Sequence, residues 1–406
     1  MGARKSPRTE RALHGDVRRA LRRMRDDLVD FACEMIRVPS ENPPGTSYGT
    51  AARVISRRLR ALGVPTRTVD PSGEGPCVFG TFGEGGRALY FSGHYDVVPA
   101  QRRDQFAPFV RQGYLHGRGS ADMKGGIAAM VYAMQALRSS GFEPNGRLVS
   151  VSVPDEETSG PRGTQALVRA GLVERDAIGM LTAEPTSDAV WNGNRGVISL
   201  RVTVRWRPAH VGLHFRGVNA FRGMLRVAAR FEALERRISS RRTKHGVSSD
   251  RARHSVLLLG GEMSGGDNFN VVPDRASFTV DRRTNPEEDF ATERERLFEV
   301  LREARAEGIR CDAEVVQEGI ASATPASGAF GRAFASTVRT VTGRTPRFEI
   351  CPGVLETRHY AAIGIPAFAY GPGTLNVSHG PHELVSVDGL VRCAEVYALA
   401  AARLLA

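Results

Sequence analysis

Five short stretches of the chain each contain residues of the types that bind metal ions, and in four of them the polar residue directly follows a short apolar run. The stretches read ALYFSGHYDVVP, GRGSADMKGG, LVSVSVPDEETSG, GMLTAEPT and FAYGPGTLNVSHGPHE, and they supply His94, Asp96, Asp122, Glu156, Glu157, Glu184 and His379. Charges at the end of a buried strand are costly to desolvate unless a cation meets them. Imidazole and carboxylate without thiolate are typical ligands of catalytic zinc or a related divalent ion. The pattern predicts a hydrolase with two metal ions.

The residue types also suggest a division of labour within such a site. Two ions about 3.5–4 Å apart can share a hydroxide and polarise a carbonyl oxygen, and Asp122 is the natural carboxylate to bridge them. Glu156 and Glu157 leave a strand end in different directions, so one can bind metal while the other accepts a proton from water. Asp96, two residues after His94, fits an outer carboxylate that orients a metal-binding imidazole.

Each motif taken alone also has a simpler explanation. An isolated HxD is more often a surface or turn feature, and DEETS could be the acidic start of a helix. HGPHE could be a solvated loop, and AEPT alone says almost nothing. All five occur in the right order in an alternating α/β chain, however, and this order favours one shared site.

Length and composition restrict the class of protein. A chain of 406 residues, 41% apolar and 25% charged, is typical of a globular protein with two domains. The longest apolar runs fall short of the roughly 18–20 residues of a membrane span, and the start of the chain lacks the apolar stretch of a secretory signal. Five scattered cysteines without C-x-x-C spacing favour a reducing compartment. We therefore expect a cytoplasmic protein.

The net charge of +12 is concentrated at the start of the chain. Residues 1–25 hold nine Lys or Arg and two Asp or Glu, a local charge of +7 that leaves +5 for the rest. A second basic cluster, 239–254, lies in a polar segment that we expect to be a mobile insertion. Neither segment interleaves aromatic side chains with its charges, as stacking on bases requires. The sequence therefore predicts neither a nucleic-acid partner nor a membrane partner.

Periodicity indicates the elements that must position the site. Helical patterns cover 16–38 and 49–62, and short apolar runs at 89–92, 148–153 and 179–183 are typical of strands buried on both faces. Strands that alternate with helices predict an α/β layer with a mostly parallel central sheet. Ligand sites of such sheets lie beyond the carboxyl ends of the strands, where one edge can gather all the candidate ligands.

The pattern changes after about residue 195. Its order there, β-α-β-β-α-β, is the split arrangement of a small ferredoxin-like α+β sandwich, and α/β features return from about residue 320. We expect a catalytic domain over 1–195 and 319–406, with 1–25 flexible, and an inserted lid and dimerisation domain over 196–318.

On these motifs the chain resembles the co-catalytic zinc amidohydrolases and exopeptidases, which include acetylornithine deacetylase, succinyl-diaminopimelate desuccinylase, aminoacylase and the glutamate carboxypeptidases. The resemblance extends from about residue 25 and rests on SGHYDVVP, GRGSADMKGG, DEETSG, AEPT, AHVGLHFRGVNA, NFNVVPD followed by DRR, and YGPG followed by SHGPHE. It implies hydrolysis of an amide bond in an N-acyl amino acid, through a hydroxide that bridges two ions, or release of an amino acid from a peptide. Zinc is the expected metal, with cobalt or manganese as alternatives.

The resemblance also assigns roles to individual residues. One ion would be held by His94, Asp122 and Glu184, and the other by Asp122, Glu157 and His379, with Glu156 as the general base. His210 matches a histidine that completes the site of a partner subunit, which implies a homodimer. Positions that would hold the substrate are Asn270, Arg282, Arg358, Gly371 and Gly373.

Four features depart from the family pattern. His382 stands where asparagine is usual, and Glu356 stands where aspartate is commoner. Trp206 and Arg207 precede His210 where small residues are usual, and the basic segment 239–254 is unusual. None of these changes removes an expected metal ligand, so we expect activity, with a pocket that differs from those of relatives.

Overall fold

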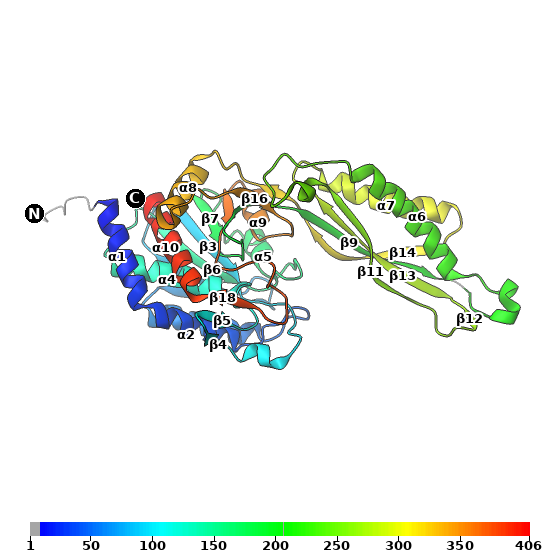
Figure 1. Cartoon of the computed structure of the whole chain (residues 1–406), viewed down its shortest axis with the longest axis horizontal. Coiled ribbons are helices and arrows are strands. Elements are labelled where there is room, and N and C mark those ends of the chain that lie inside the picture. Colours follow the sequence, from blue (N-terminus) through cyan, green and yellow to red (C-terminus); the bar gives the residue numbers. More distant parts are fainter. Residues whose placement is uncertain (1–8, 206) are drawn as a thin grey trace, which may run out of the picture. The chain divides into compact units, whose positions relative to one another are not determined.

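The computed structural model describes residues 9–205 and 207–406, which divide into two compact units (Figure 1). The first unit comprises residues 9–192, 324–349 and 356–406, and the second comprises residues 193–323 and 350–355. The segment expected as an insertion, 196–318, lies within the second unit. Trp206 and residues 1–8 of the expected flexible start lie outside the described residues.

The first unit contains most of a nine-stranded sheet with the order β1-β2-β6-β3-β7-β17-β8-β15, in which β16 also pairs with β8. Strand β15 and the last residues of β8 and β16 belong to the second unit. Its central strands β6, β3, β7 and β17 are parallel, and antiparallel strands flank them, so the sheet as a whole is mixed. A separate three-stranded sheet has the order β18-β5-β4. The strands of both sheets are β1 (Thr66–Val69), β2 (Cys77–Phe82), β3 (Ala88–His94), β4 (Phe109–Arg111), β5 (Tyr114–His116), β6 (Arg147–Val153), β7 (Gly179–Thr182), β8 (Val190–Asn194), β15 (Ser322–Ala323), β16 (Phe348–Cys351), β17 (Ala367–Ala369) and β18 (Leu384–Ser386).

Helices cover both faces of the large sheet, which is why its strands are apolar without alternation. Leu89 and Phe91 of β3 pack into the cluster under α4 and α10, whereas Ala88 and Tyr90 pack into the cluster under α5 and α9 (Figure 1). The strands predicted at 89–92, 148–153 and 179–183 are therefore confirmed as β3, β6 and β7. The helices of this unit are α1 (Glu10–Arg23), α2 (Arg25–Ile36), α3 (Tyr48–Ala61), α4 (Lys124–Ser139), α5 (Thr164–Arg169), α8 (Ala329–Thr342), α9 (Thr357–Ala362) and α10 (Val387–Leu404).

The single helix predicted over 16–38 is instead two helices that meet at Met24. Met24 has φ −95° and ψ 9°, which ends α1 before α2 begins. The apolar faces of both helices pack into the same core cluster. Methionine and arginine are good helix formers, so nothing local in the sequence signals this break.

The second unit contains a four-stranded antiparallel sheet with the order β11-β13-β9-β14, and α6 and α7 pack with it around one core. This confirms the predicted β-α-β-β-α-β order. A two-stranded ribbon, β10 with β12, lies outside that sheet. The elements of this unit are β9 (Gly196–Arg205), β10 (Ala209–His210), α6 (Ala220–Ile238), β11 (Val256–Gly265), β12 (Val271–Val272), β13 (Arg275–Thr284), α7 (Phe290–Ala306) and β14 (Cys311–Gly319).

The basic segment 239–254 is tied into the second unit, contrary to the expectation of a mobile insertion. Arg241 contacts Glu288 and Glu293 at 2.8 Å each, and Thr243 donates a hydrogen bond to Glu287 at 3.0 Å. These acidic partners lie at least 44 residues further along the chain, so composition alone could not reveal them. Among the described residues, no helix is long and apolar enough to cross a membrane.

Candidate metal centre

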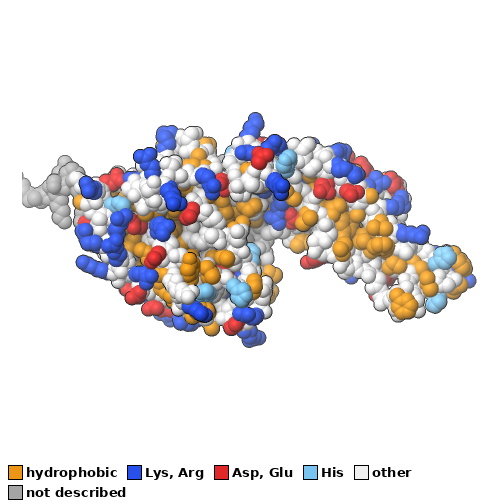
Figure 2. Space-filling view, in the orientation of Figure 1, with side chains coloured by type: hydrophobic (Ala, Val, Ile, Leu, Met, Phe, Trp, Pro, Cys, Tyr) orange, Lys and Arg blue, Asp and Glu red, His pale blue; other side chains and the backbone are white. Residues whose placement is uncertain are grey.

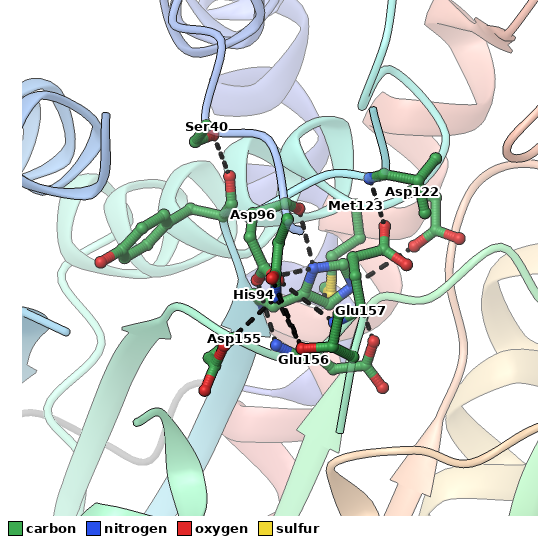
Figure 3. A network of polar contacts seen from close by, with 12 residues as sticks. Ser40, His94, Asp96, Asp122, Met123, Asp155, Glu156 and Glu157 are labelled. Carbon is green, nitrogen blue, oxygen red and sulfur yellow. Dashed lines mark hydrogen bonds and ion pairs between the residues drawn. The ribbon is translucent and has the colours of Figure 1, made fainter. Parts of the chain in front are cut away.

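The carboxyl ends of three adjacent parallel strands bring most of the candidate ligands to one edge of the sheet. His94 is the last residue of β3, Glu156 and Glu157 follow β6, and Glu184 follows β7. Asp122 comes from the loop that enters α4, and His379 comes from the loop after β17. Figure 3 shows His94, Asp122, Glu156 and Glu157 converging on one space.

The two oxygens of Asp122 face two different histidines. Its Oδ1 lies 3.3 Å from Nε2 of His94, and its Oδ2 lies 3.3 Å from Nε2 of His379. Glu184 Oε1 approaches His94 Nε2 at 3.6 Å, and Glu157 Oε2 approaches His379 Nε2 at 3.1 Å. The cluster thus has two halves that share one carboxylate, which is the arrangement expected of a bridging ligand.

The donor set fits divalent cations. Ligand atoms of His94, Asp122 and Glu157 all lie within 4.8 Å of one another. Glu184 Oε1 is buried and accepts no hydrogen bond within the described part of the chain. His379 has a φ of 64°, a conformation that residues other than glycine adopt at some cost and that recurs at ligand and active sites. Imidazole and carboxylate oxygen together suit zinc and related ions.

The protonation equilibria of this cluster are those of carboxylates crowded into a buried space. Burial raises the pKa of Glu156 well above its ordinary value, and the charges of Glu184 and Glu157 add to that rise. Burial raises the pKa of Glu184 to about 7. Hydrogen bonds to Asp122 and Glu157 raise the pKa of His379 to about 11. A divalent cation among these groups would favour ionised carboxylates and neutral imidazoles.

Asp96 lies behind His94 and is fully buried. The backbone carbonyl of Asp96 lies 3.0 Å from His94 Nδ1, whereas its carboxylate Oδ1 lies 3.5 Å away. The carboxylate instead accepts the backbone N–H groups of Glu156 and Glu157, at 3.2 and 3.1 Å. Asp96 therefore contacts the imidazole mainly through its carbonyl, and its carboxylate fixes the backbone of the two glutamates.

Glu383 supports the site, although its role was not expected from the sequence. It is 2% exposed and accepts four hydrogen bonds: from Arg118 Nη1 at 2.7 Å and from the backbone N–H groups of Gly119, Ala121 and Asp122 at 2.9–3.0 Å. The motif HGPHE is thus partly interior, while His382 beside Glu383 is exposed. An acidic residue next to the candidate ligand loop was the only available signal.

The proposed substrate residues fall into separate groups. Gly371 and Gly373 lie in the loop after β17, where Gly371 packs directly on the backbone of Ala183 and Glu184. Arg358 is buried in α9, next to the buried Glu356. In the second unit, His210 lies in the ribbon opposite Val271.

The neighbour of Val271, Asn270, accepts a hydrogen bond from Val211 through its carbonyl at 2.9 Å. His210 and Asn270 are therefore close neighbours within this ribbon of the second unit.

Arg282 does not fit the expected role in substrate binding. It is fully buried in the second unit, and its Nη2 contacts Glu288 at 2.6 Å and Glu293 at 2.8 Å. A guanidinium engaged by two buried carboxylates has no free edge for a substrate. Its partners follow β13 in a turn and a helix, and the sequence did not indicate that they would fold back onto it.

An α/β sheet that gathers histidines and carboxylates at the carboxyl ends of its parallel strands defines a class, the metal-dependent hydrolases. The sequence profile of Peptidase family M20/M25/M40 matches residues 90–403, so the chain belongs to this family. It is a hydrolase that acts on amide or peptide bonds.

Curated relatives resemble the chain in sequence, and solved structures resemble it in fold. The chain is 28% identical to succinyl-diaminopimelate desuccinylase of Methylobacterium radiotolerans over 92% of this chain and 95% of that protein. It is 29% identical to the desuccinylase of Alkalilimnicola ehrlichii over 85% and 91%. The M20 metallo-carboxypeptidase Sso-CP2 of Sulfolobus solfataricus has the same fold, with a TM-score of 0.79 at 15% identity over 93% and 99% of the chains. Human carnosine dipeptidase 1 gives a TM-score of 0.75 at 17% identity over 97% and 99%.

Proposed function

We propose that the protein hydrolyses the amide bond of N-acyl amino acids with the help of two divalent ions, zinc in preference to cobalt or manganese. The observation that carries the proposal is that one carboxylate oxygen of Asp122 faces His94 and the other faces His379. His94, Asp122 and Glu184 would hold one ion, and Asp122, Glu157 and His379 would hold the other. Two relatives that match the chain over most of its length are desuccinylases, which supports an acyl amino acid as substrate.

When bound, the ions lower the pKa of water and polarise the scissile carbonyl. Glu156 then accepts a proton from the attacking water and delivers it to the leaving amine. Its position supports this role, because its Oε2 lies 3.9 Å from His94 Nε2 at the centre of the cluster.

A substrate panel tests the proposal. Holoenzyme reconstituted with zinc, cobalt or manganese is assayed on N-acetyl and N-succinyl amino acids and on dipeptides of the same residues. We expect kcat/KM to be at least tenfold higher for acyl amino acids. A reversed preference would instead assign the site to a dipeptidase, and activity on neither class would reject both. The role of Glu156 is tested with Glu156→Gln, which removes the carboxylate. Its matched control is Glu156→Asp, which keeps a carboxylate on a shorter side chain.

We also propose that the protein forms a homodimer through its second unit and that His210 completes the site of the partner subunit. Strand β11 is an edge of its sheet, and its side chain Leu258 is 58% exposed. Phe221 and Leu225 of α6 are also about half exposed, and hydrophobic side chains gather on the visible face of this unit (Figure 2). Apolar surface on an edge strand and a neighbouring helix suits a self-complementary contact.

Subunit mixing tests the dimer. His210→Ala and Glu156→Gln should each be inactive, and a mixture that exchanges subunits should regain activity because a mixed dimer has one site with both residues intact. No recovery despite demonstrated exchange, or a fully active monomer, would contradict the proposal. All five cysteines are buried and none is in a disulfide bond, which supports the proposal of a reducing, cytoplasmic location.

A further inference from the structure

The segment between α2 and α3, which includes Val38–Asn42, is hydrogen-bonded to the residues that follow β3 and to the start of α4. Ser40 Oγ donates to the carbonyl of Tyr95 at 2.6 Å, and the backbone N–H of Val97 donates to the carbonyl of Ser40 at 2.9 Å. Lys124, at the start of α4, donates to the carbonyl of Val38 at 2.7 Å. The segment runs parallel to the residues that follow β3, because Glu41 and Val97 form a parallel bridge.

Asn42 extends this attachment into the outer layer of the site. Its backbone N–H donates to the carbonyl of Val97 at 2.8 Å. Its side-chain Nδ2 lies 2.9 Å from Asp96 Oδ2, 3.3 Å from Asp155 Oδ1 and 3.1 Å from Thr158 Oγ1. Asn42, Asp96 and Asp155 are all almost completely buried. Two buried carboxylates therefore share one neutral donor that comes from a distant part of the chain.

These two carboxylates determine where the backbone of Glu156 and Glu157 lies. Asp96 accepts the N–H groups of both glutamates. Asp155, which immediately precedes them, has a φ of 72° and is held from its other side by the backbone N–H of Arg162 at 3.0 Å and by the guanidinium of Arg162 at 2.7 Å. The side chain of Asn42 contacts both carboxylates: that of Asp96, which accepts the N–H groups of the glutamates, and that of Asp155, which precedes them in the sequence.

We propose that Asn42 is a positioning residue of the reaction, which fixes Asp96 and Asp155 and through them the backbone of Glu156 and Glu157. Without its donor, the two buried carboxylates lose their common partner and the segment 155–157 loses one of its anchors. Glu156 then samples positions from which proton transfer is slower, and Glu157 presents its oxygen less accurately. This inference rests on the roles proposed above for the two glutamates.

A purely structural role for Asn42 would lower stability and leave the chemistry of each folded molecule unchanged. The two roles are therefore separated by turnover per folded site, by KM and by the spectrum of bound cobalt. Loss of an outer hydrogen bond of this kind typically costs about 10–100-fold in activity or metal affinity. A positioning role predicts that this loss appears in kcat, with KM changed by less than about threefold, because Asn42 does not face the substrate.

The test compares Asn42→Ala with Ser40→Ala in cobalt-loaded enzyme. Ser40 is the matched control, because it lies in the same segment, is fully buried and makes a short hydrogen bond, but contacts neither carboxylate. We expect Asn42→Ala to lower kcat by about 10–100-fold and to shift the visible absorption bands of bound cobalt. Ser40→Ala should leave kcat within about twofold and the bands in place, even where its melting temperature falls.

Two results would overturn the proposal. One is a kcat of Asn42→Ala within about twofold of the parent enzyme once the folded fraction is measured, with unchanged cobalt bands. The other is an equal loss in Ser40→Ala, which would show that the segment acts only through stability. If Asn42→Ala does not fold, Asn42→Ser, which leaves a hydroxyl donor and a smaller cavity, is measured against the same control and judged by the same limits. An active Glu156→Gln enzyme would instead refute the assignment of the base, so the two failures are distinguishable.

Discussion

Glu383 offers the sharpest test of how the fold supports the site. In Glu383→Gln the side chain keeps its shape but loses its charge, so its NH2 group faces either Arg118 or the backbone donors of the Asp122 loop. The wild-type carboxylate accepts all four bonds at 2.7–3.0 Å, and both partners of the ion pair are only 1% exposed at their side chains. Removing one member of a buried ion pair costs about 3–5 kcal/mol. That is a large part of the roughly 5–15 kcal/mol that stabilises a typical domain.

We expect the free energy of unfolding of the metal-free protein to fall by about 3–5 kcal/mol, measured by urea unfolding followed by circular dichroism. Zinc affinity, measured by competition with a chromophoric chelator, should fall about 10–100-fold because the Asp122 backbone is released. Glu174→Gln is the control, since its pair with Arg147 at 2.6 Å is partly exposed and should contribute about 0–1 kcal/mol. Equal effects of the two substitutions would refute the reasoning, as would unchanged zinc affinity in Glu383→Gln.

Four further predictions follow from the site and its surroundings. Chelation should abolish turnover and zinc, cobalt or manganese should restore it; full activity with no residual metal by elemental analysis would contradict two-metal chemistry. Glu156→Gln should keep its metal and lose about 10²–10⁴-fold in kcat, whereas Glu157→Gln should lose metal, and the opposite pattern in elemental analysis would exchange their roles. Burial raises the pKa of Glu184 from 4.5 to about 7. The contribution of protonated Glu184 to the stability of the metal-free protein is therefore fully present below about pH 4.5 and is lost as the pH rises to about 7. A melting temperature that does not fall between pH 5 and pH 7 would contradict this prediction. Arg282→Met should lower the stability of the second unit by about 3–5 kcal/mol while KM of the folded enzyme stays within about threefold, and a large rise in KM without a loss of stability would return Arg282 to the substrate site.

The sequence was most informative where a local pattern of residues determines a secondary-structure element. Strand β3 could be predicted because its apolar run ends in His94, and the parallel order of β6, β3 and β7 then brought the candidate ligands to one edge. Asp122 and His379 come from loops, and only the order of the motifs connected them with that edge. These inferences needed the period of an element and the direction of a strand, both of which are local properties.

Contacts between distant segments could not be predicted in the same way. Asn42 is separated by 54 residues from Asp96 and by 113 from Asp155, and its local sequence indicates only a turn. The resemblance assigned Arg282 to the substrate, and nothing in the local sequence indicated that Glu288 and Glu293 would pack against it. Whether a charge is solvated or paired depends on the fold, and one sequence without its fold does not decide between the two.

Different buried residues hold the backbone of the two groups of candidate ligands. Asp122, the carboxylate that faces both histidines, takes its backbone position from Glu383, which comes from the C-terminal part of the chain. The backbone of Glu156 and Glu157 takes its position from Asp96, which is held by Asn42 from the N-terminal part. Among the described residues Glu383 and Asn42 make no hydrogen bond to each other, although the segment of Asn42 also reaches the start of α4 through the bond from Lys124 to Val38. The cluster therefore requires segments from both ends of the catalytic unit to be folded before its ligands converge.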